Sequence, residues 1–265
     1  MTGCTFHAAA TIDASEPGGA DAPNVAPQDG SVLADSGLAR TACSTPNATG
    51  LVACYEFEDS FADGTLLDSS INHHDATTSG MSPAMRGPSN AASVGSQART
   101  YAPQASDLDR HDAYTITMWI KPRSLPFGGG AYGLVDHENQ YALALVDDQI
   151  DGFVMVRCIH TDVDAEWVAM TQSSNWTFIA CTYDGNNLCS RRFTSAGDHD
   201  AFCHGDAGQP NATGVHGLAI GHLSNNGGPI DRFDGDIDSV QLYSRALAKA
   251  DLCAVAGQSS TCLDD

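Results

Sequence analysis

The chain has 265 residues, of which 42% are hydrophobic, and this is enough to bury one good core, so we expect one main folded domain. Its formal net charge of −21 repels phosphate backbones and anionic membrane surfaces, which excludes nucleic acid as an expected partner. The chain also lacks the roughly 18 consecutive apolar residues that a membrane-spanning helix needs, so we expect no transmembrane span.

The N-terminal segment is polar and broken by Pro and Gly, as in Glu16-Pro17-Gly18-Gly19 and Ala26-Pro27-Gln28-Asp29-Gly30. It has no sustained apolar period, so we expect residues 1–43 to form a disordered, flexible tether. Cys4, directly before this segment, resembles the end of a bacterial lipobox whose apolar signal stretch is missing. We therefore predict lipidation at Cys4 and a lipid anchor, and the alternative is an unpaired thiol near a disordered terminus.

From Thr49 onward the pattern changes to short alternating runs broken by Gly, Pro, Asn and Asp, which is typical of an all-β sandwich. In the strand expected at 114–120, the even-numbered residues from Tyr114 fall on one face and the odd-numbered residues, including Trp119, on the other. Further strands are expected at 141–146, 153–159, 167–170, 178–183 and 218–222.

Two short segments are typical of hairpin turns because their residues tolerate positive φ: Asp151-Gly152 and Asp184-Gly185-Asn186-Asn187. After the last strand, residues 245–255 are expected to form a short helix, and Ser244 is placed to cap it.

The nine cysteines indicate an oxidising compartment, because no Cys-x-x-Cys spacing supports a metal or redox motif. Eight of them lie within or at the edge of the expected domain: Cys43, Cys54, Cys158, Cys181, Cys189, Cys203, Cys253 and Cys262. We predict a bridge between Cys189 and Cys203 across a hairpin, and Cys158 with Cys181 can join two neighbouring strands. The other four can tie the ends of the domain together, although eight cysteines allow roughly a hundred connectivities.

Four segments, taken in order, carry a family resemblance: LVACYEFE at 51–58, YTITMWIKP at 114–122, WTFIACTYDG at 176–185 and FDGDIDSVQLYSRAL at 233–247. Together they resemble the laminin-G-like family of concanavalin-A-like jelly rolls over roughly residues 44–258. The resemblance implies an all-β, antiparallel two-sheet jelly-roll β-sandwich at 44–265 with a short C-terminal helix. It also implies a domain that binds carbohydrate or protein ligands.

The same resemblance implies a calcium site. Asp68-Ser69-Ser70-Ile71-Asn72 is similar to the family's Asp-x-Ser-Gly-Asn loop, although Ile71 and Asp75 stand where the family often has Gly. Ca²⁺ takes about six to eight oxygen ligands, which such a loop supplies together with acidic residues on the first and last strands. The predicted ligands are Glu56, Glu58, Asp63, Asp68, Asn72 and Asp238. The alternative is that these residues form a solvated rim on a very acidic protein.

Motifs of the common hydrolases are missing from the sequence. The related glucanases carry alternating Glu-x-Asp-x-x-Glu carboxylates on one strand, and this chain has no such run. It also lacks a Gly-x-Ser-x-Gly elbow and a His-Glu-x-x-His helix, and Gly128-Gly129-Gly130 lacks the lysine of a phosphate loop. We therefore predict a protein without catalytic activity and rank a glycoside hydrolase last.

Aromatic side chains in loops are the expected platforms for a sugar, because an apolar ring face stacks on phenyl, phenol or indole. The candidates are Phe127, Tyr132 and Trp167, and the alternative is that they belong to the core. We predict an extracellular or cell-envelope module that binds glycans or mediates adhesion. The alternative is a disulfide-bridged envelope scaffold whose partner is a cell-surface protein, and the oligomeric state stays open.

Overall fold

The computed structural model describes residues 43, 49–59, 61, 63–147, 153–160, 163–170, 175–194, 199–210 and 213–258, with only the backbone described at 163–168 and 199. The predicted tether at 1–43 lies outside this set apart from Cys43, so both the tether and lipidation at Cys4 stay predictions. The elements of the described residues are β1 (Leu51–Tyr55), β2 (Thr65–Leu66), β3 (Ala76–Arg86), β4 (Ser89–Ala102), β5 (Tyr114–Pro122), β6 (Ala131–His137), β7 (Tyr141–Asp147), β8 (Val154–His160), β9 (Val163–Met170), β10 (Thr177–Tyr183), β11 (Leu188–Thr194), β12 (His199–His204), β13 (Leu218–Ile220), β14 (Leu223–Asn225), β15 (Gly228–Ile230), β16 (Gly235–Tyr243) and α1 (Lys249–Val255).

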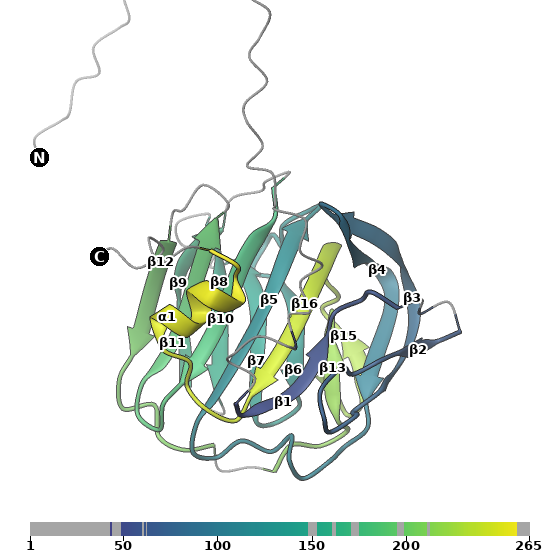
Figure 1. Ribbon diagram of the computed structural model, residues 1–265. Coiled ribbons are helices and arrows are strands. Elements are labelled where there is room, and N and C mark those ends of the chain that lie inside the picture. The colour runs from purple at the N-terminus through teal and green to yellow at the C-terminus, as the bar shows by residue number, and fades with distance from the viewer. Residues whose placement is uncertain are drawn as a thin grey trace, which may run out of the picture. The chain divides into compact units, whose positions relative to one another are not determined.

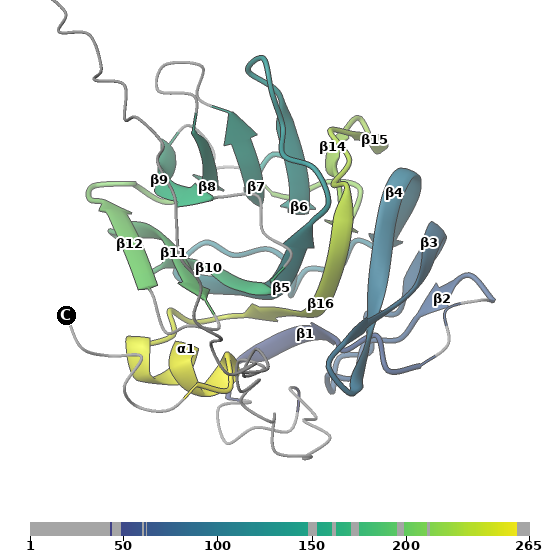
Figure 2. The same cartoon turned by 90° about the horizontal axis from the view of Figure 1, so that it is seen from above.

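Fourteen of the strands form one continuous antiparallel sheet that curls into two facing layers, and β14 and β15 form a separate two-stranded sheet (Figure 1 and Figure 2). One layer contains β12, β11, β10, β5 and β16, with β1 paired to β16. The other contains β13, β6, β7, β8 and β9. β4 pairs with β16 near one end and with β13 at the other, so the β3–β4 ribbon joins the layers. The predicted jelly-roll sandwich is therefore confirmed.

The central strand β5 is buried on both faces. Ile116 and Met118 point into the core between the two layers and are fully buried. On the opposite face, Trp119 packs in a second apolar cluster with Phe178 and with Leu252 of α1. Helix α1 thus covers the outer face of the first layer, as Figure 2 shows. This division of the even- and odd-numbered residues of β5 follows the predicted alternation.

The helix begins later than predicted, and Ser244 does not cap it. Ala248 stands at the N-cap position without a side-chain cap, while the Ser244 hydroxyl donates to the carbonyl of Gly50. The reason is that Thr115 holds the preceding segment extended, because its hydroxyl donates to the carbonyl of Arg245 and accepts from the N–H of Leu247. Among the described residues, no helix has the length and apolar character that crossing a membrane requires.

The β3–β4 ribbon contains a bulge on β4, at residues 95–98, opposite Gly80. Strand pairing shifts between Ser79 and Met81, and Gly80 has a φ of +72°. A Cβ at this position would lie 2.7 Å from the carbonyl oxygen of Gln97. Only glycine therefore fits, and the bulge bends the ribbon between the part that pairs with β16 and the part that pairs with β13.

Three disulfides lie among the described residues: Cys43–Cys54, Cys158–Cys181 and Cys189–Cys203. Cys189 and Cys203 stand directly opposite each other on β11 and β12, as predicted for a hairpin. The bridge between Cys158 of β8 and Cys181 of β10 joins the two layers through the core, rather than two neighbouring strands of one layer. Cys253 is also disulfide-bonded. Its partner is outside the described residues, where both Cys4 and Cys262 lie.

We expect Gly80→Ala to lower the free energy of unfolding more than Gly87→Ala, the matched control in the turn of the same ribbon. Both glycines have positive φ, so alanine strains the backbone by about 1–2 kcal/mol at each. A Cβ at Gly87 meets nothing within 4 Å. A Cβ at Gly80 meets the backbone of Gln97, and this clash lowers the free energy of unfolding of Gly80→Ala by about 1–3 kcal/mol more. Urea denaturation of the oxidised protein measures both losses, and equal losses would contradict a sterically required bulge.

Candidate functional site

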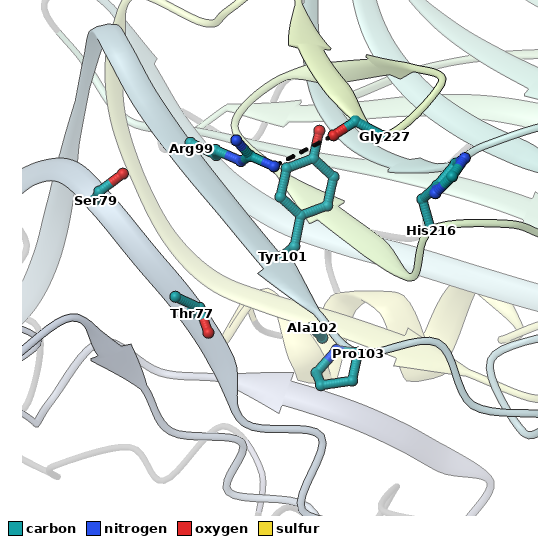
Figure 3. Close-up of a pocket in the computed structure, with 8 residues that line it drawn as sticks. All are labelled: Thr77, Ser79, Arg99, Tyr101, Ala102, Pro103, His216 and Gly227. Atoms are coloured by element: carbon teal, nitrogen blue, oxygen red, sulfur yellow. Dashed lines mark hydrogen bonds between the residues drawn. The ribbon is translucent and has the colours of Figure 1, made fainter.

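A cavity of about 410 Å³ opens beside the far end of the β3–β4 ribbon (Figure 3). Its volume falls within the range of about 300–1,000 Å³ that is usual for small-molecule sites. The lining residues are Thr77, Ser79, Arg99, Tyr101, Ala102, Pro103, His216 and Gly227. They come from the ribbon, from the segment before β13 and from the β14–β15 hairpin, and none of them carries a carboxylate.

Four of the lining side chains share one face of the ribbon because of its register. Thr77 pairs with Tyr101, and Ser79 pairs with Arg99. The residues between them, Thr78 and Thr100, are buried on the opposite face, where their hydroxyls hydrogen-bond at 2.7 Å. Residues two apart along a strand lie on the same side. The ribbon therefore presents two hydroxyls, a phenol and a guanidinium together.

Tyr101 occupies the centre of this group and is half-buried. Its ring contacts the Arg99 guanidinium, whose carbon is 5.4 Å from the ring centroid, and the tilted His222 ring, whose centroid is 4.7 Å away. The Ser224 hydroxyl donates to the Tyr101 oxygen at 3.3 Å. Burial raises the pKa of the Tyr101 phenol, so the group stays neutral at physiological pH. The ring is thus held in place without being fully covered.

The β14–β15 hairpin forms one wall of the cavity and is held by two carboxylates behind it. Glu138 accepts from the backbone N–H groups of Asn226 at 2.7 Å and Gly227 at 3.0 Å. Asp136 accepts from the N–H of Ser224 at 2.7 Å. Burial raises the pKa of the Asp136 carboxyl to about 7. These contacts fix the turn where Asn226 and Gly227 adopt positive φ.

Two of the three predicted aromatic platforms, Phe127 and Tyr132, lie outside this cavity. Phe127 is 85% exposed in the β5–β6 loop and does not line the cavity. Tyr132 also lies outside the cavity: its hydroxyl hydrogen-bonds to Ser124 at 3.1 Å, and its ring packs edge-on against Phe233. Trp167 belongs to β9, but its side chain is outside the description. The alternation of Arg99 and Tyr101 was the sequence signal for the cavity, and we did not predict it.

Asp68, the first residue of the predicted calcium loop, is buried and fully used by hydrogen bonds. One carboxylate oxygen accepts from the N–H groups of Cys54 at 2.7 Å and Ser70 at 2.9 Å. The other accepts from the Ser70 hydroxyl at 2.7 Å and the His74 N–H at 2.8 Å. Asn72 donates its side-chain N–H to the carbonyl of Val52. The loop is therefore held together by its own polar groups.

The predicted ligand on the last strand, Asp238, is also engaged. Arg86 donates its Nε–H to this carboxylate at 2.5 Å and lies over the Trp119 ring at 4.8 Å. Burial raises the pKa of Asp238 to about 6 despite the arginine.

The remaining three predicted ligands contact separate groups. Glu56 accepts from the N–H of Cys43, Glu58 from Asn90, and Asp63 from the N–H of Thr65. Within the described part of the chain, no three His, Cys, Asp or Glu residues are grouped to hold a metal ion. Calcium binding through the six residues stays a prediction.

The comparisons with known proteins agree with the fold. The model of the Concanavalin A-like lectin/glucanases superfamily matches residues 94–253. The comparison with curated proteins gives no match.

Three solved structures illustrate the likeness. Domain 4 of AbnA, a GH43 extracellular arabinanase from Geobacillus stearothermophilus in complex with arabinotriose, is 20% identical with a TM-score of 0.58, over 78% of this chain and 98% of that one. The binding domain of botulinum neurotoxin DC in complex with SialylT is 11% identical with a TM-score of 0.55, over 80% of this chain and 52% of that one. Trypanosoma rangeli sialidase is 14% identical with a TM-score of 0.56, over 83% of this chain and only 34% of that one. These likenesses show the fold alone.

We expect Asp68→Asn to destabilise the domain by about 1–3 kcal/mol, because an amide nitrogen cannot accept from the Ser70 hydroxyl and the His74 N–H. Asp63→Asn, which also removes one charge but at an exposed position, serves as the control and should cost less. Thermal unfolding in EDTA and in excess calcium measures both. We expect the same loss in the two buffers, and a loss seen only with calcium would show that Asp68 is a metal ligand.

We also expect the free energy of unfolding of Asp136→Asn, relative to that of the parent, to be higher at pH 8 than at pH 5. The folded-state pKa of Asp136 is raised from 3.8 to about 7, so the folded protein holds a proton that the unfolded chain releases. Stability from this group is present at low pH and is lost as the pH rises through 7. Asparagine does not titrate and its oxygen still accepts from Ser224.

Asp231→Asn, at an exposed position, controls for the lost charge. Urea denaturation at pH 5 and 8 should show no pH-dependent gain for that control, and parallel pH profiles for the parent and Asp136→Asn would contradict the raised pKa.

Proposed function

The chain belongs to the Concanavalin A-like lectin/glucanases superfamily, and from this premise we propose that it is a carbohydrate-binding module without catalytic activity. We place its binding site in the cavity around Tyr101. The observation that carries the proposal is the half-buried Tyr101 ring, held in a cavity beside the exposed hydroxyls of Thr77 and Ser79.

The chemistry of the cavity suits a sugar. The apolar face of a pyranose or furanose ring stacks on a phenol ring, while its hydroxyls exchange hydrogen bonds with polar groups at the rim. Tyr101 supplies the ring, and Thr77, Ser79 and Arg99 supply the polar groups. A likeness in fold supports the same reading, since arabinanase domain 4 is in complex with arabinotriose and the toxin binding domain with SialylT.

The absence of a carboxylate from the lining supports binding rather than hydrolysis. Most glycosidases need two carboxyl groups that flank the scissile bond. None of the eight lining residues is Asp or Glu. The acids closest to the wall, Asp136 and Glu138, accept from backbone N–H groups of the β14–β15 hairpin. The geometry therefore favours a module that holds a glycan without cleaving it.

Disulfides support a location outside the cytoplasm, because such bridges persist in oxidising compartments. A protein-interaction scaffold is the second candidate, and it is favoured by the exposed Phe127 in the β5–β6 loop. Such a scaffold would use that loop in place of the cavity.

We expect Tyr101→Ala to weaken binding to the best ligand of a glycan array by about tenfold or more, which corresponds to about 1.4 kcal/mol. Tyr101→Phe keeps the ring and should bind within about threefold of the parent, since it loses only the hydroxyl contact with Ser224. Isothermal titration calorimetry on the oxidised full chain measures each affinity.

Phe127→Ala is the matched control, because it removes an exposed ring outside the cavity. It should leave the affinity unchanged. If Phe127→Ala abolishes binding and Tyr101→Ala does not, the site is misplaced. If no glycan binds the parent, the interaction scaffold becomes the better account.

A further inference from the structure

The charge of the cavity lining differs from that of the chain as a whole. The chain has 33 Asp and Glu against 12 Lys and Arg. The eight lining residues include Arg99 and His216, both with side chains that can carry positive charge, and no acid. A positive group in a concave, partly enclosed site attracts anions more strongly than one on a flat surface. The lining is therefore suited to an anionic ligand in a protein that is otherwise strongly negative.

Arg99 has no carboxylate partner among the described residues, which distinguishes it from several other arginines. Arg86, Arg123, Arg192 and Arg245 each form an ion pair with an aspartate. Arg99 instead rests over the Tyr101 ring and donates one long hydrogen bond, of 3.5 Å, to the carbonyl of Gly227. Figure 3 shows this contact beside the phenol oxygen of Tyr101. The guanidinium is positioned, yet most of its donors are available to a ligand.

Two acids, Asp136 and Glu138, lie behind the wall and accept from backbone N–H groups of the β14–β15 hairpin. Both oxygens of Glu138 are directed at backbone N–H groups, which carry partial positive charge. Asp136 is 7% exposed, and its burial favours the neutral, protonated carboxyl near pH 7. Arg232 donates its Nε–H to the carbonyl of Ala98, and burial, followed by the charge of Arg232, lowers the pKa of His222. Arg99 itself contacts neither acid: it rests over Tyr101 and donates to the carbonyl of Gly227.

We propose that the cavity selects sugars that carry a carboxylate, such as uronic acids, and that Arg99 binds this group. The inference rests on the proposed function of the same site. A planar guanidinium donates two parallel hydrogen bonds to a carboxylate, and such charge-assisted bonds are stronger than neutral ones. With the sugar ring stacked on Tyr101, the hydroxyls of Thr77 and Ser79 face the remaining ring substituents.

The test compares three probes that share one backbone: oligogalacturonate, its methyl ester and its carboxyl-reduced form. Calorimetry on the oxidised full chain gives the affinity for each probe. We expect the acid to bind about tenfold or more tightly than the neutral probes, which corresponds to about 1.4 kcal/mol. Arg99→Gln should remove this preference and leave the affinity for the neutral probes within about threefold of the parent.

Arg123→Gln is the matched control, because it also removes one positive charge from an exposed arginine and should not change the preference. A preference that survives in Arg99→Gln, or falls equally in Arg123→Gln, would overturn the role of Arg99. Equal affinity of the parent for all three probes, with binding still lost in Tyr101→Ala, would overturn acid selection and leave the proposed function intact. No binding of any of the three probes to the parent would also overturn acid selection. If Tyr101→Ala leaves the affinity for the probes and for the best array glycan unchanged, both the acid selection and the proposed function are overturned.

Discussion

The bend of the β3–β4 ribbon is the constraint on which both the layers and the cavity depend. β4 hydrogen-bonds to β16 through residues 92–94 and to β13 through Tyr101 and Ala102, so one strand takes part in both layers. Gly80 lies opposite the interval between these two pairings, where residues 95–98 of β4 form the bulge against this single residue of β3. Thr77, Ser79, Arg99 and Tyr101 all lie beyond the bulge, on the side of β13. The bend thus places four polar side chains next to the β14–β15 hairpin, which the flat register of an unbent ribbon would not do.

Buried or half-buried carboxylates act as backbone partners at two separate loops of this acidic chain. Asp68 holds the loop after β2, while Asp136 and Glu138 hold the hairpin at the cavity wall. A loop that folds back on itself leaves N–H groups without strand partners, and a carboxylate satisfies several at once with charge-assisted bonds. Part of the negative charge of the chain is therefore structural. The hairpin above Tyr101 is fixed by such bonds, so that wall of the cavity is formed before any ligand arrives.

The sequence predicts strands and their buried faces well where apolar residues alternate with polar ones, and poorly where they do not. Strands β5 and β10 are rich in branched and aromatic residues, so their existence, faces and hairpin turns follow from period and turn chemistry. The β3–β4 ribbon is composed largely of Ala, Ser, Thr and Gly and is partly exposed on both faces, so it carries no such period. The residues of the proposed site, Arg99 and Tyr101, lie there, whereas the sequence pattern predicts loop aromatics such as Phe127. The acids of the predicted calcium loop show a second limit. Sequence indicates that Asp68 has a special role, but only the fold decides whether its oxygens face a metal or backbone N–H groups.

Two arginines of the same ribbon show how burial separates a structural cation from one available to a ligand. Arg86 pairs with Asp238, which is 1% exposed, and stacks on Trp119. Breaking that pair would leave a buried carboxylate without its partner, at a cost of about 3–5 kcal/mol, so Arg86 cannot be given up to a ligand. Arg99 is exposed, rests on a half-buried phenol and has no acid to release. Replacing its water by a ligand carboxylate breaks no internal ion pair. The difference between Arg86 and Arg99 does not follow from residue type, or from the exposure of the aromatic ring that each arginine contacts. It follows from whether the fold has already placed an anion against the guanidinium.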